Sequence, residues 1–108
     1  MGEENGFSVQ VDATGAGGTT AALVLRGELD AYAADRLTDA IDRIDPTAAG
    51  LDLDVAGLSF IDSSGLRVLL RAGERTVADA TPTLRHAQPA LLRLLDLTGL
   101  LDHFVLAP

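Results

Sequence analysis

The sequence predicts an α/β fold: a mixed β-sheet of four or five strands with helices mainly on one face. Along the 108 residues, segments in which apolar residues alternate, as in strands, are followed by segments in which they recur at helical spacing. This pattern predicts the order β-β-α-β-α-β-α, followed by a short last strand. A glycine-rich link joins the first two strands, which is typical of an antiparallel hairpin. The stretch L-D-L-D-V, from Leu51 to Val55, alternates strictly. Its acids indicate that one face of the sheet meets solvent, so helices should cover the other face.

The first two strands are predicted at Phe7–Asp12 and Ala22–Leu29, where apolar and polar residues alternate. Between them, T-G-A-G-G-T-T, from Thr14 to Thr20, is predicted to be a plain loop. Its glycines do not indicate a phosphate-binding P-loop, because that motif needs a lysine and the chain has none. The length fits a single domain over residues 1–108, with residues 1–6 as a flexible end.

Asp30 is a good N-cap for a helix predicted at Ala31–Ile44. The apolar residues of that helix recur at helical spacing, at Leu37, Ala40, Ile41 and Ile44. Asp45-Pro46 should end it, because the residue before a proline avoids the α conformation. The strand at Leu51–Val55 then follows Gly50.

A second helix follows the stretch F-I-D-S-S-G, and its apolar face comprises Leu66, Leu69, Leu70, Gly73 and Val77. Thr81-Pro82 ends this helix. Pro89 suits the first turn of a third helix, and Gly99 is placed to stop it. The last elements are predicted at Thr83–Ala87 (strand), Ala90–Leu97 (helix) and His103–Leu106 (strand).

The formal net charge is −8, and this acidity argues against binding to nucleic acid or to an anionic membrane surface. Without cysteine there are neither disulfides nor thiolate metal ligands, and His86 and His103 alone do not suggest a metal cluster. The longest apolar run is far shorter than the roughly 20 residues of a spanning helix. The acidic start M-G-E-E-N-G does not resemble a secretory signal. We therefore expect a cytoplasmic protein.

The stretch D-S-S-G, from Asp62 to Gly65, lies where a strand gives way to a helix. Asp62 or Ser63 is expected to cap the helix, and Gly65 allows close packing. Because backbone N–H groups and the helix dipole favour negative charge at this end, the same geometry also suits a phosphate. A serine displayed there is a good phosphoacceptor, and its phosphate would alter binding rather than folding.

Catalytic interpretations of this stretch are disfavoured. A serine hydrolase elbow would read G-x-S-x-G and need a histidine base, and neither histidine has a sequence context that marks it as one. A phospho-aspartate receiver normally needs a lysine near the phosphoryl group, and this chain has no lysine. Asp52 and Asp54 could form a carboxylate pair of the glycosidase kind, but their alternation explains them better as a solvated face.

Three arginines follow at helical spacing, at Arg67, Arg71 and Arg75. They form a basic stripe on an otherwise acidic protein. Either this stripe is a solvated face balanced by nearby acids, or it is a face that binds a partner of complementary charge.

The run L-S-F-I-D-S-S-G-L-R-V-L-L, from Leu58 to Leu70, resembles the signature of bacterial anti-sigma factor antagonists of the STAS domain family. G-E-L-D, at Gly27–Asp30, and L-T-G-L, at Leu97–Leu100, resemble two further turns of that family in the same order. The resemblance spans about Phe7 to Leu106. It implies the STAS fold, a mixed sheet with helices packed mainly on one side.

The resemblance also implies a function without enzymatic activity or a cofactor. Such proteins bind an anti-sigma factor, often one with serine kinase activity, and so release a sigma factor. Phosphorylation of the first serine of the pair, Ser63 here, ends the interaction, and a PP2C-type phosphatase reverses it. By position, the resemblance implies that Asp30, Asp62, Ser63, Ser64 and Gly65 belong to the partner-binding surface. From the basic stripe, we add Arg67 and Arg71 to this expected partner-binding set.

Arg67 departs from the family pattern, where relatives often have a small residue, so it bears on which partner is recognised. Two alternatives stay open within the family. One is a nucleotide-binding domain, which the missing lysine and phosphate loop count against. The other is a scaffold subunit of a stressosome or a transport-accessory assembly.

Overall fold

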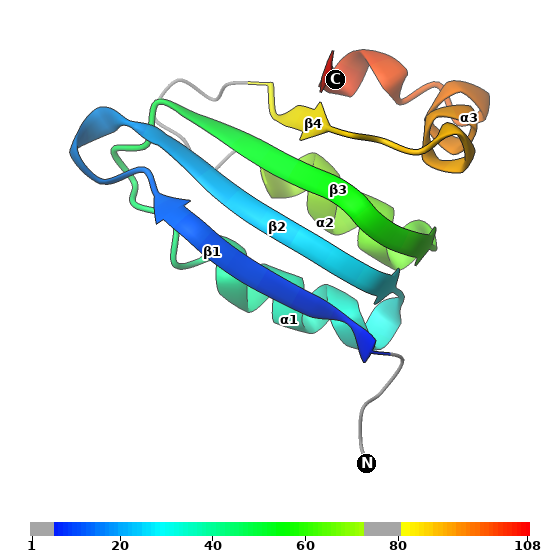
Figure 1. The fold of residues 1–108 in the computed structure, drawn as a ribbon, viewed down its shortest axis with the longest axis horizontal. Coiled ribbons are helices and arrows are strands. Elements are labelled where there is room, and N and C mark those ends of the chain that lie inside the picture. Colours follow the sequence, from blue (N-terminus) through cyan, green and yellow to red (C-terminus); the bar gives the residue numbers. More distant parts are fainter. Residues whose placement is uncertain (1–5, 73–80) are drawn as a thin grey trace.

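A computed structural model describes residues 6–72 and 81–108. The chain forms a five-stranded sheet in the order β1-β2-β3-β4-β5 (Figure 1). β1 is antiparallel to β2, and the other neighbours are parallel. The predicted mixed sheet is therefore confirmed. Its strands are β1 (Ser8–Thr14), β2 (Thr20–Leu29), β3 (Gly50–Ile61), β4 (Thr83–Arg85) and β5 (Val105–Ala107).

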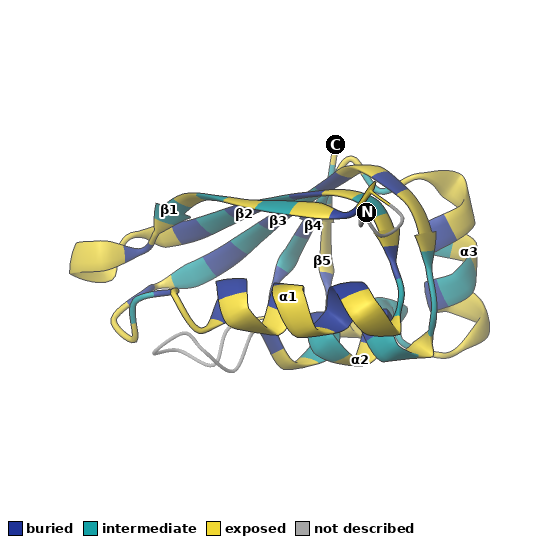
Figure 2. Ribbon diagram, turned by 90° about the horizontal axis from the view of Figure 1, so that it is seen from below, coloured by how far each residue is buried: buried dark blue, intermediate teal, exposed yellow. Residues whose placement is uncertain are grey.

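Helices α1 (Ala31–Ile41) and α2 (Ser63–Ala72) lie on one face of this sheet (Figure 2). Their buried residues meet the buried strand residues Leu51, Leu53 and Val55 in one core cluster. Asp52 and Asp54 point to the other face and are only half-buried. The strict alternation of the third strand thus predicted correctly that one face is left open to solvent.

The loop between β1 and β2 is a hairpin connection, as predicted, and contains the short 3-10 helix η2 (Ala16–Gly18). Gly15 has a φ of 81°, and a Cβ at this position would lie 2.4 Å from the Cβ of Ala48. Glycine is therefore required here both by the left-handed backbone and by the close approach of another segment.

α1 is shorter than predicted, because it ends at Ile41 and not at Ile44. The amide of Ile44 donates to the carbonyl of Ile41, a tighter bond than that of an α-helix. The next amide, of Asp45, donates to the carbonyl of Thr14 at the end of β1. Ile44 is still buried. Its apolar character therefore indicated a core position correctly, although the residue lies beyond the end of the helix.

β3 is longer than the predicted strand and continues to Ile61. Its pairing with β2 shifts register between Val24 and Arg26 and again between Gly27 and Glu28. These irregularities interrupt the alternation after Val55, which is why sequence periodicity did not extend the strand. The extension matters for function, because it carries the chain directly to Asp62.

The chain ends with α3 (Pro89–Leu97), the 3-10 helix η4 (Leu101–His103) and β5. As predicted, Pro89 occupies the first turn of α3, and Gly99, with a φ of 75°, follows its end. α3 packs beside the end of the sheet and buries Leu91 and Leu95 (Figure 2). The predicted second helical face is confirmed as far as Ala72, whereas Gly73, Val77 and most of the predicted flexible end lie outside the described residues.

Candidate functional site

Two helix starts lie side by side at one end of the sheet. β2 and β3 are parallel neighbours, and Leu29 pairs with Ile61 at their last positions. Each strand is followed at once by an aspartate and a helix, first Asp30 and α1, then Asp62 and α2. The amide of Asp62 donates to the carbonyl of Leu29 at 3.2 Å, which ties the two junctions together.

The two aspartates cap their helices in the same way. A carboxylate oxygen of Asp30 accepts from the amide of Ala33 at 3.0 Å, and one of Asp62 accepts from the amide of Gly65 at 3.0 Å. Each bond satisfies one of the amides that a helix start leaves without an intrahelical partner. Of the two candidates for the second cap, Asp62 is therefore the residue that forms it.

Gly65 holds the start of α2 against the first junction. A Cβ on this residue would lie 2.5 Å from Cγ of Leu29 and 2.5 Å from its carbonyl oxygen. Such distances are far below any real contact, and a carbonyl of the backbone cannot move aside cheaply. The close packing expected of Gly65 is present, and Gly65 is itself buried.

The two serines of this turn differ in exposure. Ser63, the first residue of α2, is exposed, whereas Ser64 is half-buried. Within the described part of the chain, no hydrogen bond of the Ser63 hydroxyl is found. Ser63 thus presents a hydroxyl to solvent on a helix start whose backbone is already fixed by Asp62 and Gly65.

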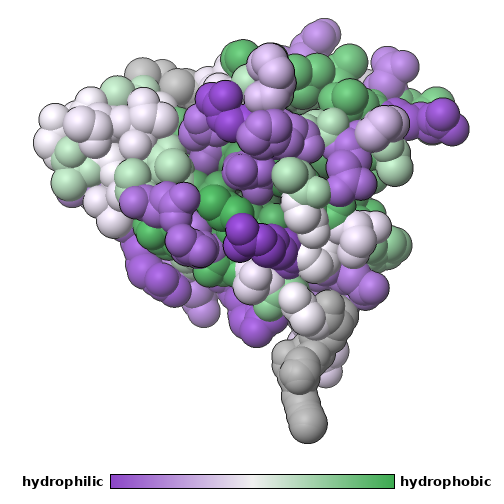
Figure 3. All heavy atoms as spheres, in the orientation of Figure 1, coloured by the Kyte–Doolittle hydropathy of each residue, from purple (hydrophilic) through white to green (hydrophobic). Residues whose placement is uncertain are grey.

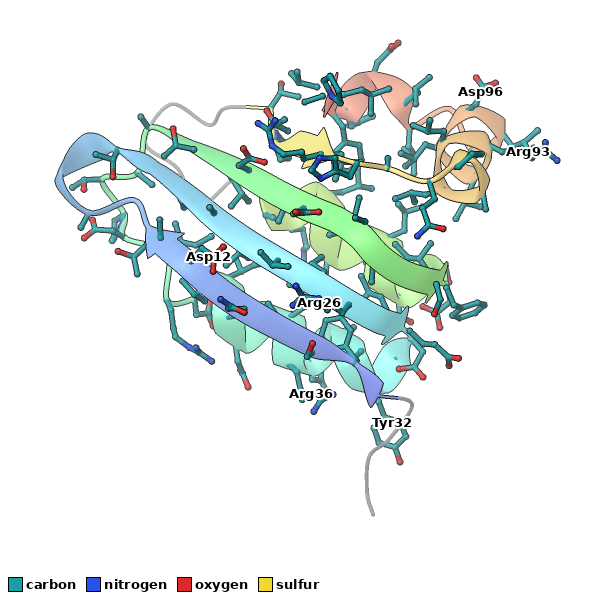
Figure 4. The ribbon with its side chains drawn as sticks, in the orientation of Figure 1. Asp12, Arg26, Tyr32, Arg36, Arg93 and Asp96 are labelled. Atoms are coloured by element: carbon teal, nitrogen blue, oxygen red, sulfur yellow. The ribbon has the colours of Figure 1, made fainter. Side chains whose placement is uncertain are left out.

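Two exposed aromatic residues flank this turn, and the sequence analysis missed both. Tyr32, the second residue of α1, is 76% exposed, and Phe60, two residues before Asp62, is 50% exposed. Tyr32 projects from the start of α1 (Figure 4). An aromatic side chain outside the apolar stripe of its helix was the available signal for Tyr32. The exposure of Phe60 follows the irregular pairing of β3, which the sequence did not reveal.

Arg67 and Arg71 are exposed one turn apart on α2, as their spacing predicted. Across residues 6–72 and 81–108, no ion pair involves either guanidinium group. Arg75, the third member of the predicted stripe, lies outside the described residues. The described part of the stripe therefore presents two exposed cations.

A pocket of about 180 Å³ lies between the end of β3 and α3. β4 pairs with β3 only as far as Asp54, and beyond that point α3 takes its place beside the strand. Gln88, just before α3, donates to the carbonyl of Ala56 at 2.6 Å and closes one end of the gap. The pocket is lined by Leu58, Ser59, Phe60, Ile61, Gln88, Ala90, Leu91 and Leu94. Through Phe60 it adjoins the turn that bears Ser63.

The open face of the sheet carries a different set of charges. Asp52 pairs with Arg85 at 2.8 Å, and Asp54 lies 3.3 Å from the His86 ring. The pKa of Asp54 is lowered, first by a hydrogen bond from the amide of Ala56 and then by His86. Both carboxylates thus have basic partners, which supports their interpretation as a solvated face rather than as a carboxylate pair.

Within the described residues, no cluster of three or more histidine, aspartate or glutamate side chains is arranged to hold a metal ion. In the same part of the chain, no helix has the length and apolar character needed to cross a membrane. Hydrophobic side chains gather on the surface in the upper part of Figure 3, where α3 and the segment after it lie. Leu97, Val105 and Leu106 are exposed in this C-terminal part.

Comparisons with known proteins agree with this geometry. Residues 9–107 match a family model described as "Mlab, STAS domain". An anti-sigma factor antagonist from Mycobacterium paratuberculosis is a structural neighbour at 25% identity, with a TM-score of 0.77, covering 100% of this chain and 91% of its own.

Two structures of the Bacillus cell fate determinant SpoIIAA are also similar in fold. The unphosphorylated form has 24% identity and a TM-score of 0.69, covering 94% of this chain and 89% of its own. The phosphorylated form has 22% identity and a TM-score of 0.64, covering 94% of this chain and 91% of its own. No curated protein sequence matches the chain.

Proposed function

The chain belongs to the STAS domain family, and on that premise we propose that it is an anti-sigma factor antagonist switched by phosphorylation of Ser63. The observation that carries this proposal is the exposed hydroxyl of Ser63 on a capped helix start. The structural neighbour from Mycobacterium paratuberculosis, described as an anti-sigma factor antagonist, supports the same role. The protein then acts in the cytoplasm by binding an anti-sigma factor, which releases a sigma factor.

The proposed binding surface, which we call the switch surface, centres on Ser63 and extends to both sides. It includes the exposed aromatic residues Tyr32 and Phe60 and the cations Arg67 and Arg71. Aromatic and arginine side chains are the usual anchors of protein interfaces. Of the remaining residues of the expected set, Asp30 and Asp62 cap the two helix starts and Gly65 lets them pack closely. Ser64 is half-buried beside them.

Phosphorylation of Ser63 adds about −1.5 to −2 charges at pH 7. The start of α2 tolerates this charge because the helix dipole places about half a positive charge there. A partner docked on the switch surface has no matching positive charge for the phosphate, so its binding to this surface is weakened. The phosphate therefore ends binding while the fold survives. A PP2C-type phosphatase acting on Ser63 restores the active form.

The test is mass-spectrometric mapping after incubation with the cognate anti-sigma kinase and ATP. We expect modification of Ser63 and none of Ser64. Ser63→Ala should abolish the modification and keep partner binding, whereas Ser64→Ala should leave the modification in place. Modification of Ser64 in the unsubstituted protein would overturn the proposed mechanism.

In this proposal the protein binds a partner and catalyses nothing. A titration with ATP and GTP separates it from a nucleotide-binding domain of the same family. We expect no binding at micromolar concentrations and no turnover. Micromolar affinity with hydrolysis would contradict the proposal.

A further inference from the structure

We propose that Arg67 binds the phosphate of phosphorylated Ser63, so that phosphorylation also withdraws this arginine from the switch surface. The inference rests on the proposed function for the identity of the modified residue. It concerns the regulation of the same site: what the phosphate does within this chain before any partner is considered.

The spacing brings the two side chains together. Ser63 and Arg67 are the first and fifth residues of α2, and both are exposed. Residues four apart on a helix are neighbours, with roughly 5–6 Å between their Cβ atoms. Side chains on a helix also tilt toward its N-terminus, so that of Arg67 leans over the turn that begins with Ser63.

The guanidinium of Arg67 is available for this contact. In the part of the chain that the structure describes, it takes part in no ion pair. Arg71 is the other described cation of α2, but it lies eight residues after Ser63, roughly 12 Å along the helix axis. Arg67 is therefore the cation of this helix that can reach the phosphate.

The helix dipole tolerates the phosphate charge but does not supply every donor that a phosphate can accept from. The amide of Gly65 is already taken by the carboxylate of Asp62. The acids Glu28, Asp30 and Asp62 lie at the same end of the sheet and repel a second negative group. An arginine can offer two parallel N–H donors to a phosphate, and such charge-assisted pairs are stronger than neutral ones. Arg67 would supply the positive charge that this acidic surrounding lacks.

The consequence is a switch with two effects. In the unphosphorylated protein, the exposed Arg67 can pair with an acidic group of the partner. In the phosphorylated protein, the same guanidinium is engaged within α2. Phosphorylation then adds negative charge to the switch surface and removes a cation from it at once.

The experiment is a ³¹P NMR pH titration of the protein with phosphoserine encoded at position 63. Its second pKa is compared among the unsubstituted chain and the variants Arg67→Gln, Arg67→Lys and Arg71→Gln. A nearby cation favours the dianion and lowers this pKa. We expect Arg67→Gln to raise it by about 0.2–0.4 units, the shift that corresponds to a helix pair of this spacing. Arg67→Lys should keep most of the lowering, and Arg71→Gln should leave the pKa unchanged.

Two results would overturn the inference. An unchanged pKa in Arg67→Gln means that the arginine does not bind the phosphate. Equal increases of this pKa in Arg67→Gln and Arg71→Gln mean that the phosphate responds only to the overall charge of α2 and has no specific contact with Arg67. No partner is present in this titration, so its outcome stands whether or not a kinase modifies Ser63, and failure of the proposed function is seen separately by mass spectrometry.

Discussion

The starts of α1 and α2 are built alike and differ in what they present. Both follow a parallel strand, and both are capped by an aspartate, Asp30 or Asp62, that accepts from the third helical amide. The first helical residue is exposed in each, but it is Ala31 in α1 and Ser63 in α2. The comparison teaches that the cap is a structural device common to both helix starts; in the proposed function, the chemistry lies in the residue after the second cap.

The later positions of the first turn differ in a complementary way. The second position holds exposed Tyr32 in α1 and half-buried Ser64 in α2. The third holds Ala33 in α1 and Gly65 in α2, and both are buried. α1 thus presents an exposed aromatic side chain. α2 instead has a glycine at its third position, which lets it pack closely against Leu29 at the first junction.

The largest expected effect on stability comes from exchanging the third positions. Gly65→Ala should destabilise the protein by about 2–3 kcal/mol, because the added Cβ meets the carbonyl and side chain of Leu29. The matched change, Ala33→Gly, should cost less, about 1–2 kcal/mol, since it removes one buried methyl group and adds backbone freedom. Urea unfolding of both variants measures the difference. Equal losses would mean that α2 does not need its glycine.

The aromatic residues distinguish the surface around the two starts from the rest of the molecule. We expect Tyr32→Ala and Phe60→Ala each to weaken binding of the anti-sigma partner by about 1–2 kcal/mol, or roughly 5–30-fold. Val105→Ala is a control, because Val105 is exposed to the same degree, 51% against 50% for Phe60, but lies on the edge strand β5. Calorimetric titrations supply the affinities. A loss in the control as large as that of Phe60→Ala would contradict the proposed surface.

Each of the two caps should contribute to stability. Asp30→Ala and Asp62→Ala are each expected to cost about 1 kcal/mol, the usual loss for an N-cap. Asp35→Ala, an exposed change within α1, should have almost no effect on unfolding. A cost for Asp62→Ala much below that for Asp30→Ala would show that the two starts are not equivalent in stability.

The smallest effect is expected from placing an acid after each cap. Ser63→Asp and Ala31→Asp should change the free energy of unfolding by less than about 1 kcal/mol and toward greater stability, because an acid at a helix start interacts favourably with the dipole. Thermal unfolding compares them directly. If Ser63→Asp unfolded the protein while Ala31→Asp did not, the site would control folding and not binding.

Local signals in the sequence predicted much of this arrangement. Asp30 was expected as a cap, and Asp62 was one of two candidates for the second cap beside Ser63, because such a residue before an apolar helical pattern satisfies an amide locally. The alternation from Leu51 to Val55 predicted the open face of the sheet, because it reports burial at each position. These features depend on residues close together in the chain, so the sequence was sufficient.

Features that depend on long-range pairing were missed. The two junctions adjoin because Leu29 pairs with Ile61, and no local pattern specifies that register. The exposure of Phe60 follows from the irregular pairing of β2 and β3. The early end of α1 follows from the bond between Asp45 and Thr14, residues far apart in sequence. Each of these three features depends on which distant segment of the chain packs beside the residues concerned.

The most direct measurement is the affinity of the anti-sigma partner for three forms of the protein: unphosphorylated, phosphorylated at Ser63, and phosphorylated at Ser64. We expect the phosphate on Ser63 to weaken binding by about 100-fold, or about 2.7 kcal/mol, while the unfolding midpoint stays nearly the same. Equal affinity of the unphosphorylated and Ser63-phosphorylated forms would contradict the proposal that the exposed hydroxyl after the second cap is the switch.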